Sequence, residues 1–422
     1  MQRKHRGNPF ILIITLILMA IGIIVMFTLS PVRAHFLNSQ GSNYSDYYFF
    51  LRQIIYVVAS IIFFIFMYFF PIKKLLKASS WLFLGAVLIN LFLLISAKLN
   101  LPFAQCTNGA CRWIDLKIAT FQPAELLKFS IILYLSNIAV KCRQAGGLTK
   151  GWFKNTMRGV RTPKEFFIRI IKNPEGIFWI QYVFAVGISI LFVMVAQKDF
   201  GSSIPIIVEA VAILFVAGVT WPKLIITVAV AGAIGVLLAI SSPHRMERIS
   251  TFLGQGDQAN SYHIEQALIA IGTGGFFGVG VGNSIQATGY LPEAINDSVF
   301  AIIAETFGFV GVIIVIITFA ILLYHLIRTA DMSRDHSYSL VAVGIFAWIA
   351  THVCVNIAAM SNIIPLTGIT LPLLSYGGTS MIFVGGALGL AYQISAYTER
   401  KPILDKERKE EPAHEATRSR RW

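Results

Sequence analysis

The acidic residue Asp297 stands where a polar stretch, 290–297, meets a long apolar segment. If a helix begins there, its dipole lowers the pKa of the carboxyl group, whereas apolar neighbours raise it. A carboxylate in this position is suited to act as a general base, with Glu293 as a supporting carboxylate. The alternative role for Asp297 is to cap the helix.

Basic side chains that could hold an anionic group occur at two other places. Glu125 and Lys128 are three residues apart, which places them on one face of a helix. They form an internal ion pair that fixes helix packing, or a site where Glu125 orients Lys128 toward an anionic substrate, and the two roles are compatible. Arg245 and Arg248 open a long polar loop, where they either contact lipid headgroups or hold a phosphate.

Two further segments are candidates for substrate binding. Asp199 lies at a tight turn, where it either caps the next helix or contacts the substrate. The segment 365–380 holds two prolines and three glycines, so it cannot be a continuous spanning helix. Irregular backbone at membrane depth survives only where protein or a cavity surrounds it. We therefore expect Ser375, Tyr376 and Gly377 to share a site with Asp297.

Several other kinds of site are excluded or left open. The glycines between 272 and 282 have neither the GxGxxG register nor the lysine of a phosphate-binding loop. No Cys-rich or metal-ligand cluster is visible, so we predict no metal site, although Mg²⁺ or Mn²⁺ could assist a reaction. Cys106 and Cys111, five residues apart, could form a disulfide or remain free thiols.

The composition is that of a membrane protein. Of the 422 residues, 56% are hydrophobic and 13% are charged, whereas a soluble domain carries about 25% charged residues. The mean hydropathy is +0.69. The formal net charge is +14, but the basic residues lie in short loops and at both ends. This distribution excludes a nucleic-acid-binding surface.

Ten segments are long and apolar enough, or nearly so, to cross a bilayer as helices, which requires about 20 residues each. They are 10–29, 53–70, 79–96, 123–140, 177–196, 202–220, 224–242, 298–326, 338–360 and 379–397. The sequence therefore predicts an all-α integral membrane protein with about ten transmembrane helices. A β-barrel would instead show alternating segments of about ten residues.

The distribution of Lys and Arg predicts the orientation. Of the 35 basic residues, 26 lie in segments on the same side as the N-terminus, which places both termini in the cytoplasm. We expect a cytoplasmic N-terminus at 1–9, a membrane domain at 10–398 and a charged cytoplasmic tail at 399–422. The outer loop 243–296, between the seventh and eighth helices, is expected to be ordered because it contains apolar residues.

The segment 365–380 resembles the signature of the SEDS family (FtsW, RodA and SpoVE), which polymerises peptidoglycan glycan strands. Three further motifs resemble those of the family in the same order. They are Arg112-Trp113-Ile114 with Gln122-Pro123-Ala124-Glu125 and Lys128, then Asp199-Phe200-Gly201, then 290–297 with the essential carboxylate. Gly282-Asn283-Ser284 with Gln286 is closer to the division type, FtsW.

This resemblance implies an inverting glycosyltransferase that polymerises lipid II outside the bacterial cytoplasmic membrane, for septal cell-wall synthesis. Asp297 would take the proton from the acceptor sugar's 4-hydroxyl, and Lys128, Arg245 and Arg248 would neutralise the pyrophosphate leaving group. The implied partners are lipid II, the lipid-linked glycan strand, a class B penicillin-binding protein and other divisome proteins.

Three alternatives remain on the sequence alone. They are an elongation polymerase of the RodA type, a non-enzymatic scaffold for a transpeptidase, and a lipid II flippase or transporter. A transporter places its polar site near the bilayer midplane. The charges here gather instead at the predicted outer helix ends, which favours the polymerase.

Overall fold

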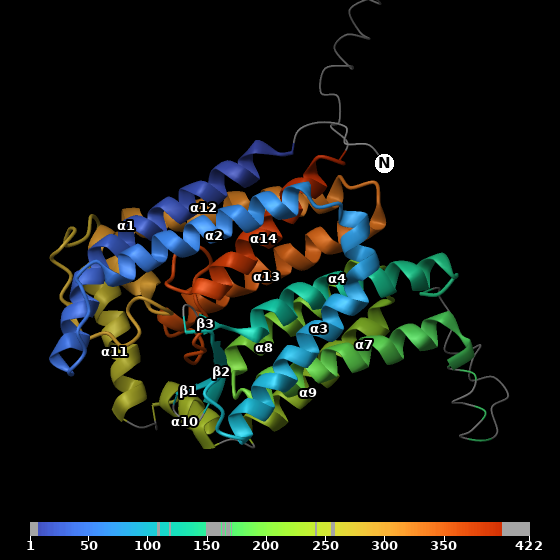
Figure 1. The fold of residues 1–422 in the computed structure, drawn as a ribbon, viewed down its shortest axis with the longest axis horizontal. Coiled ribbons are helices and arrows are strands. Elements are labelled where there is room, and N and C mark those ends of the chain that lie inside the picture. Colours follow the sequence, from blue (N-terminus) through green and yellow to red (C-terminus); the bar gives the residue numbers. More distant parts are fainter. Residues whose placement is uncertain are drawn as a thin grey trace, which may run out of the picture.

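The computed structural model describes residues 7–107, 110–117, 120–148, 171–240, 243–254 and 258–398, with residues 162, 165 and 169. All ten predicted helices are present and form a bundle (Figure 1). They are α1 (Pro9–Ser39), α2 (Tyr48–Phe69), α3 (Ile72–Lys98), α4 (Pro123–Gln144), α7 (Pro174–Ile190) with the π-helical turn η1 (Leu191–Ala196), α8 (Phe200–Val216), α9 (Trp221–Ile240), α12 (Val299–Asp331), α13 (His336–Met360) and α14 (Gly378–Ser395). The predicted tail 399–422 lies outside the described residues.

The protein is a multi-pass membrane protein. Eight of the described helices are long and apolar enough to cross a membrane, namely α1, α2, α3, α4, α7 with η1, α9, α12 and α13. Helix α8 is apolar but has only 17 residues. Helix α14 packs closely on α2 because the glycines at the contact have no side chain that would hold the two helices apart. A Cβ atom added at Gly389 would lie 2.3 Å from the Phe64 carbonyl oxygen.

A small antiparallel sheet, which the sequence did not predict, joins α3 to α4. It consists of β1 (Ala104–Thr107), β2 (Ala110–Asp115) and β3 (Thr120–Phe121), in the order β1-β2-β3. Cys106 pairs with Cys111 across β1 and β2, and the two form a disulfide. The structure thus decides between the two states that the sequence left open.

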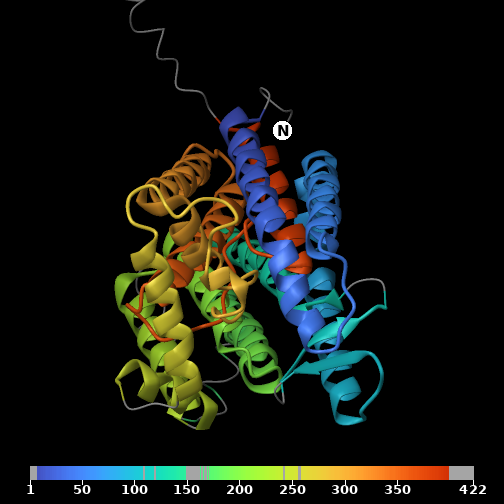
Figure 2. The same ribbon diagram turned by 90° about the vertical axis from the view of Figure 1, so that its left-hand side faces the viewer.

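Among its described residues, the loop 243–296, which the sequence predicts to lie outside, forms regular elements. It contains α10 (Pro243–Phe252), α11 (Gln258–Thr273) and the short 3₁₀ turn η2 (Gln286–Thr288). In both views α10, α11 and the sheet lie at the end of the bundle away from the N-terminus (Figures 1 and 2). The candidate residues at the predicted outer helix ends are therefore at the same end as this loop.

Helix α12 is broken near its start, and the outer loop packs into the break. Gly308 has φ 66° and ψ −163°, which interrupts the helical hydrogen bonds. The amide groups of Val279 and Gly280 donate to the carbonyl oxygens of Glu305 and Thr306, at 2.9 and 3.1 Å. Because these carbonyls are satisfied by the loop, the break is compatible with membrane depth.

Candidate active site

Asp297 is buried and lies two residues before α12, whose N-cap position is taken by Ser298, so the Asp297 side chain does not cap this helix. Burial and then the nearby Glu293 raise the pKa of Asp297 to about 7, whereas Arg248 and a hydrogen bond from Ser298 lower it. Ser298 Oγ lies 3.4 Å from Asp297 Oδ1. A carboxyl group with this pKa is well suited to exchange a proton near neutral pH.

Asn356 of α13 ties Asp297 to the segment 365–377. Its Nδ2 donates to the carbonyl oxygens of Asp297 and Ile369, each at 2.7 Å. The Tyr376 amide also donates to the Ile295 carbonyl at 2.8 Å. The structure thus brings the proline- and glycine-rich segment together with Asp297. Asn356 was not predicted, since its only signal in the sequence is an amide side chain in an apolar helix.

Ser375, Tyr376 and Gly377 shape this segment. Ser375 Oγ accepts a hydrogen bond from the Leu371 amide at 2.9 Å. The Tyr376 side chain hydrogen-bonds Arg52 and Tyr56 of α2, and burial raises its pKa. Gly377 directly precedes α14. Ser375 and Tyr376 therefore use their side chains to hold the segment 365–377 in its conformation.

Asp199 caps α8, which is the first of its two predicted roles. Its Oδ1 accepts from the Ser202 amide at 3.0 Å and its Oδ2 from the Ser202 hydroxyl at 2.8 Å. Gln122 Nε2 lies 3.5 Å from the same Oδ2. The Asp199 side chain is buried, so its main role in this structure is to begin α8.

Gly201, in the first turn of α8, packs directly against the segment 365–377. A Cβ atom there would lie 2.4 Å from the Thr367 carbonyl oxygen, so Gly201→Ala should displace the segment. We expect a cost of about 1–3 kcal/mol, measured as a lower melting temperature in detergent. Gly187→Ala in α7 is the control, since no atom lies within 4 Å of its added Cβ. Equal melting temperatures for the two variants would contradict this packing.

Arg248 of α10 lies within electrostatic range of Asp297. Burial and then Arg112 lower the pKa of Arg248, while Asp297 and Asp199 raise it. Arg248 Nη1 donates to the Leu366 carbonyl at 3.1 Å, and its buried Nε has no hydrogen-bond partner among the described residues. Arg245 lies in the same helix, but its side chain is outside the described part of the structure.

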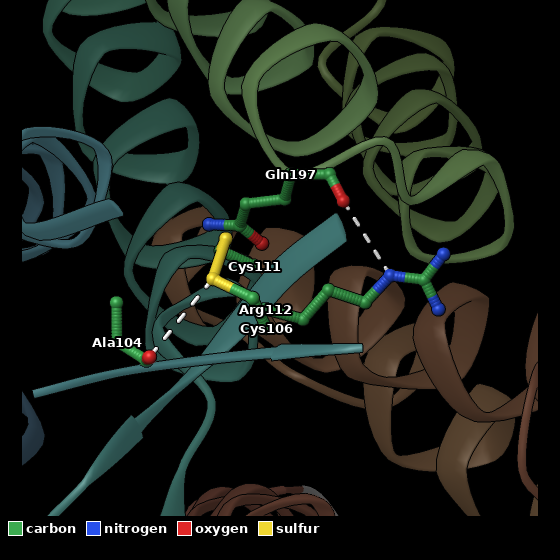
Figure 3. The surroundings of a disulfide bond; sticks show 5 residues. All are labelled: Ala104, Cys106, Cys111, Arg112 and Gln197. Atoms are coloured by element: carbon green, nitrogen blue, oxygen red, sulfur yellow. Dashed lines mark hydrogen bonds between the residues drawn. A yellow bond between two sulfur atoms is a disulfide. The ribbon is translucent and has the colours of Figure 1, made fainter. Parts of the chain in front are cut away.

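Arg112 brings a second guanidinium toward Arg248. It follows Cys111 of the disulfide in β2, and its Nε points to the Gln197 carbonyl oxygen at 3.4 Å (Figure 3). Its Nη2 donates to the Lys198 carbonyl at 3.0 Å. Arg112 therefore holds the turn that leads into Asp199. In the sequence it stood out only as part of a motif.

Lys128 forms the internal ion pair that was one of its two predicted roles. Its side chain is 0% exposed, and Nζ lies 2.8 Å from Glu125 Oε1 and 3.1 Å from His352 Nε2. His352 Nδ1 lies 3.2 Å from the Thr370 carbonyl oxygen. Lys128 thus faces protein groups and reaches the segment 365–377 through His352.

Glu293 and His263 flank Asp297. Glu293 is exposed and has φ 51°, a left-handed conformation that its carbonyl stabilises by accepting the Asn296 amide at 2.9 Å. His263 of α11 lies 2.8 Å from Ser298 Oγ, and burial lowers its pKa to about 4. His263 is therefore neutral at physiological pH. No sequence pattern singled it out.

The sequence as a whole matches known proteins. Residues 9–400 match the family model FtsW/RodA/SpoVE, described as cell cycle protein. A relative from Coxiella burnetii, "Probable peptidoglycan glycosyltransferase FtsW", is 32% identical over 93% of this chain and 97% of its own. "Stage V sporulation protein E" from Bacillus subtilis is 30% identical over 94% of this chain and 99% of its own.

Solved structures share the fold. One, described as "Structural coordination of polymerization and crosslinking by a peptidoglycan synthase complex", has a TM-score of 0.67 and 20% identity, and covers 93% of this chain and 99% of its own. The rod shape determining protein RodA of Thermus thermophilus has a TM-score of 0.60 and 20% identity, and covers 95% of this chain and 100% of its own.

Proposed function

The chain belongs to the cell cycle protein family of FtsW, RodA and SpoVE, and on this premise we propose that it polymerises lipid II as a peptidoglycan glycosyltransferase. The observation that carries the proposal is the buried Asp297 carboxyl group within electrostatic range of Arg248. It lies where the segment 365–377, α13 and the start of α12 meet. The names of the sequence relatives favour the division type, FtsW.

In the proposed reaction, the Asp297 carboxylate takes the proton from the 4-hydroxyl of the acceptor sugar. The hydroxyl oxygen attacks the anomeric carbon of the lipid-linked donor strand, with inversion, and undecaprenyl pyrophosphate leaves. General-base catalysis of this kind contributes about 10²–10⁴-fold. Arg248, with Arg112 nearby, supplies positive charge for the pyrophosphate. Among the described residues no group of three His, Cys, Asp or Glu could hold a metal ion.

We propose a positioning role for Lys128 and Glu125. Direct contact between Lys128 and a pyrophosphate would require its surroundings to open, because the side chain is fully buried. Its bond to His352, which in turn bonds Thr370, instead holds the segment 365–377 in place. Glu125 holds the Lys128 ammonium from the other side.

We further propose that the protein lies in the bacterial cytoplasmic membrane with both termini inside and Asp297 at the outer end. The surplus of Lys and Arg on the side of the N-terminus supports this orientation. A class B penicillin-binding protein is the proposed partner. Its support is the structural relative described as a synthase complex of polymerization and crosslinking.

Reconstitution tests the function. The purified protein, with its transpeptidase partner, is placed in vesicles that contain fluorescent lipid II, and a β-lactam blocks crosslinking. We expect linear glycan strands, resolved by gel electrophoresis. Lipid II that crosses the bilayer without forming strands would instead identify a transporter.

The pH dependence of polymerisation should follow the charges around Asp297. A general base acts when deprotonated, so kcat/KM should rise with pH through about 7, the pKa of Asp297. Glu293 raises this pKa and Arg248 lowers it. Glu293→Gln should therefore move the rise to lower pH, and Arg248→Gln to higher pH. Shifts in the same direction for both variants would contradict the assignment of Asp297.

A further inference from the structure

Another buried carboxyl group lies near the Glu125–Lys128 pair and has no role in the proposed reaction. Glu209 is on α8, which packs against α4 and α13. Its side chain is 0% exposed, and neither carboxyl oxygen has a hydrogen-bond partner among the described residues. An acidic side chain is rarely buried to this extent without a partner.

The charges around Glu209 already balance without it. Lys128 and Glu125 are the charged groups with which Glu209 interacts in the described part of the chain, and they form an ion pair with each other. One further titratable group, His352 of α13, is hydrogen-bonded to Lys128 Nζ through its Nε2. The net charge of this group therefore depends on His352 and Glu209.

The hydrogen bonds of His352 make it neutral. Its Nε2 faces the Lys128 ammonium, which can only donate, so this nitrogen carries no proton. Its Nδ1 faces the Thr370 carbonyl oxygen, which can only accept, so this nitrogen carries the proton. An ionised Glu209 would then leave one uncompensated negative charge inside the membrane bundle.

We propose that Glu209 is a proton-binding site, occupied at neutral pH, in the interior of the bundle. Burying an uncompensated charge is far more unfavourable than burying a carboxylic acid whose hydroxyl lacks a partner. Lys128 cannot supply the missing charge, because Glu125 already neutralises it. With the proton bound, the group formed by Glu125, Lys128, His352 and Glu209 carries no net charge.

The proton also protects the link to the segment 365–377. An ionised Glu209 would be a second anionic partner for Lys128 and would compete with His352 for the ammonium. His352 joins Lys128 to Thr370. Proton binding at Glu209 thus favours the arrangement in which this segment is held next to Asp297. This inference does not depend on the reaction at Asp297.

Infrared spectroscopy tests the site directly. The Asp297→Asn protein, in which the carboxyl group of the candidate base cannot contribute, is measured at pH 8 in a detergent free of esters. We expect a carbonyl band of a protonated carboxylic acid, and adding Glu209→Gln should remove the intensity of one group. The proposal is overturned if the band keeps its full intensity.

Thermal unfolding gives a second, independent test with a matched pair of variants. Glu209→Gln replaces a neutral acid by a neutral amide, so its melting temperature should equal or exceed that of the parent. Glu125→Gln removes the anionic partner of Lys128 and should lower the melting temperature by several degrees. A Glu209→Gln protein that melts as low as Glu125→Gln, or fails to accumulate, would contradict a bound proton.

Discussion

Asp297→Asn is expected to lower the rate of lipid II polymerisation by about 10²–10⁴-fold or more, while the protein stays folded. The amide has nearly the same size as the carboxyl group but cannot take a proton. Polymerisation by wild type and variant is compared in vesicles with the same partner and the same lipid II. Full activity of the variant would remove Asp297 as the general base.

The melting temperature separates this loss of catalysis from a loss of structure. The pKa of Asp297 is raised in the folded protein from 3.8 to about 7. A raised pKa means that the folded state binds the proton more tightly than the unfolded state. Its contribution to stability is therefore present at acid pH and is lost as the pH rises through about 7. At pH 8 the neutral Asp297→Asn variant should melt at the same temperature as wild type or higher.

Lys128→Met should cause a large loss of stability, greater than that expected for Gly201→Ala. It leaves the buried Glu125 carboxylate without its cation, and removing one partner of a buried pair typically costs about 3–5 kcal/mol. We expect a much lower melting temperature or a failure to accumulate in the membrane. Size-exclusion chromatography and thermal unfolding in detergent measure both outcomes.

Two further variants show whether the unpaired charge of Glu125 causes the loss of stability in Lys128→Met. Lys73→Met, at an exposed position of α3, should change the stability by less than about 0.5 kcal/mol. The double variant Lys128→Met with Glu125→Gln removes both charges, so it should recover part of the loss. A double variant less stable than Lys128→Met alone would show that the ion pair is not what stabilises this part of the bundle.

The transmembrane helices could be predicted from the sequence because an apolar run of about 20 residues with few charges is typical of a membrane span. Their ends were harder to predict. Helix α1 continues ten residues past the predicted end at Leu29, through Pro31 to Ser39, because a helix outside the bilayer core need not be apolar. The sheet was missed because its strands are short, with two to six residues each, and carry no clear alternation.

The candidate site was predictable where one local pattern carries the signal. Asp297 and Asp199 both precede helices, and both positions are visible in the sequence. The contacts between distant segments were not predictable. Arg248 and Leu366 are 118 residues apart in sequence, and Asn356 joins Asp297 to Ile369 across two elements. Only the packing of α10, α12 and α13 brings these groups together.

As the proposed base, the Asp297 carboxyl group should titrate near neutrality and in step with the rate. Its titration can be followed directly by infrared difference spectra of wild type against Asp297→Asn between about pH 5 and pH 9. We predict a single group that ionises near pH 7, together with the rise in polymerisation rate. A carboxyl group that is already ionised at the acid end of this range, or that ionises apart from the change in rate, would contradict this role.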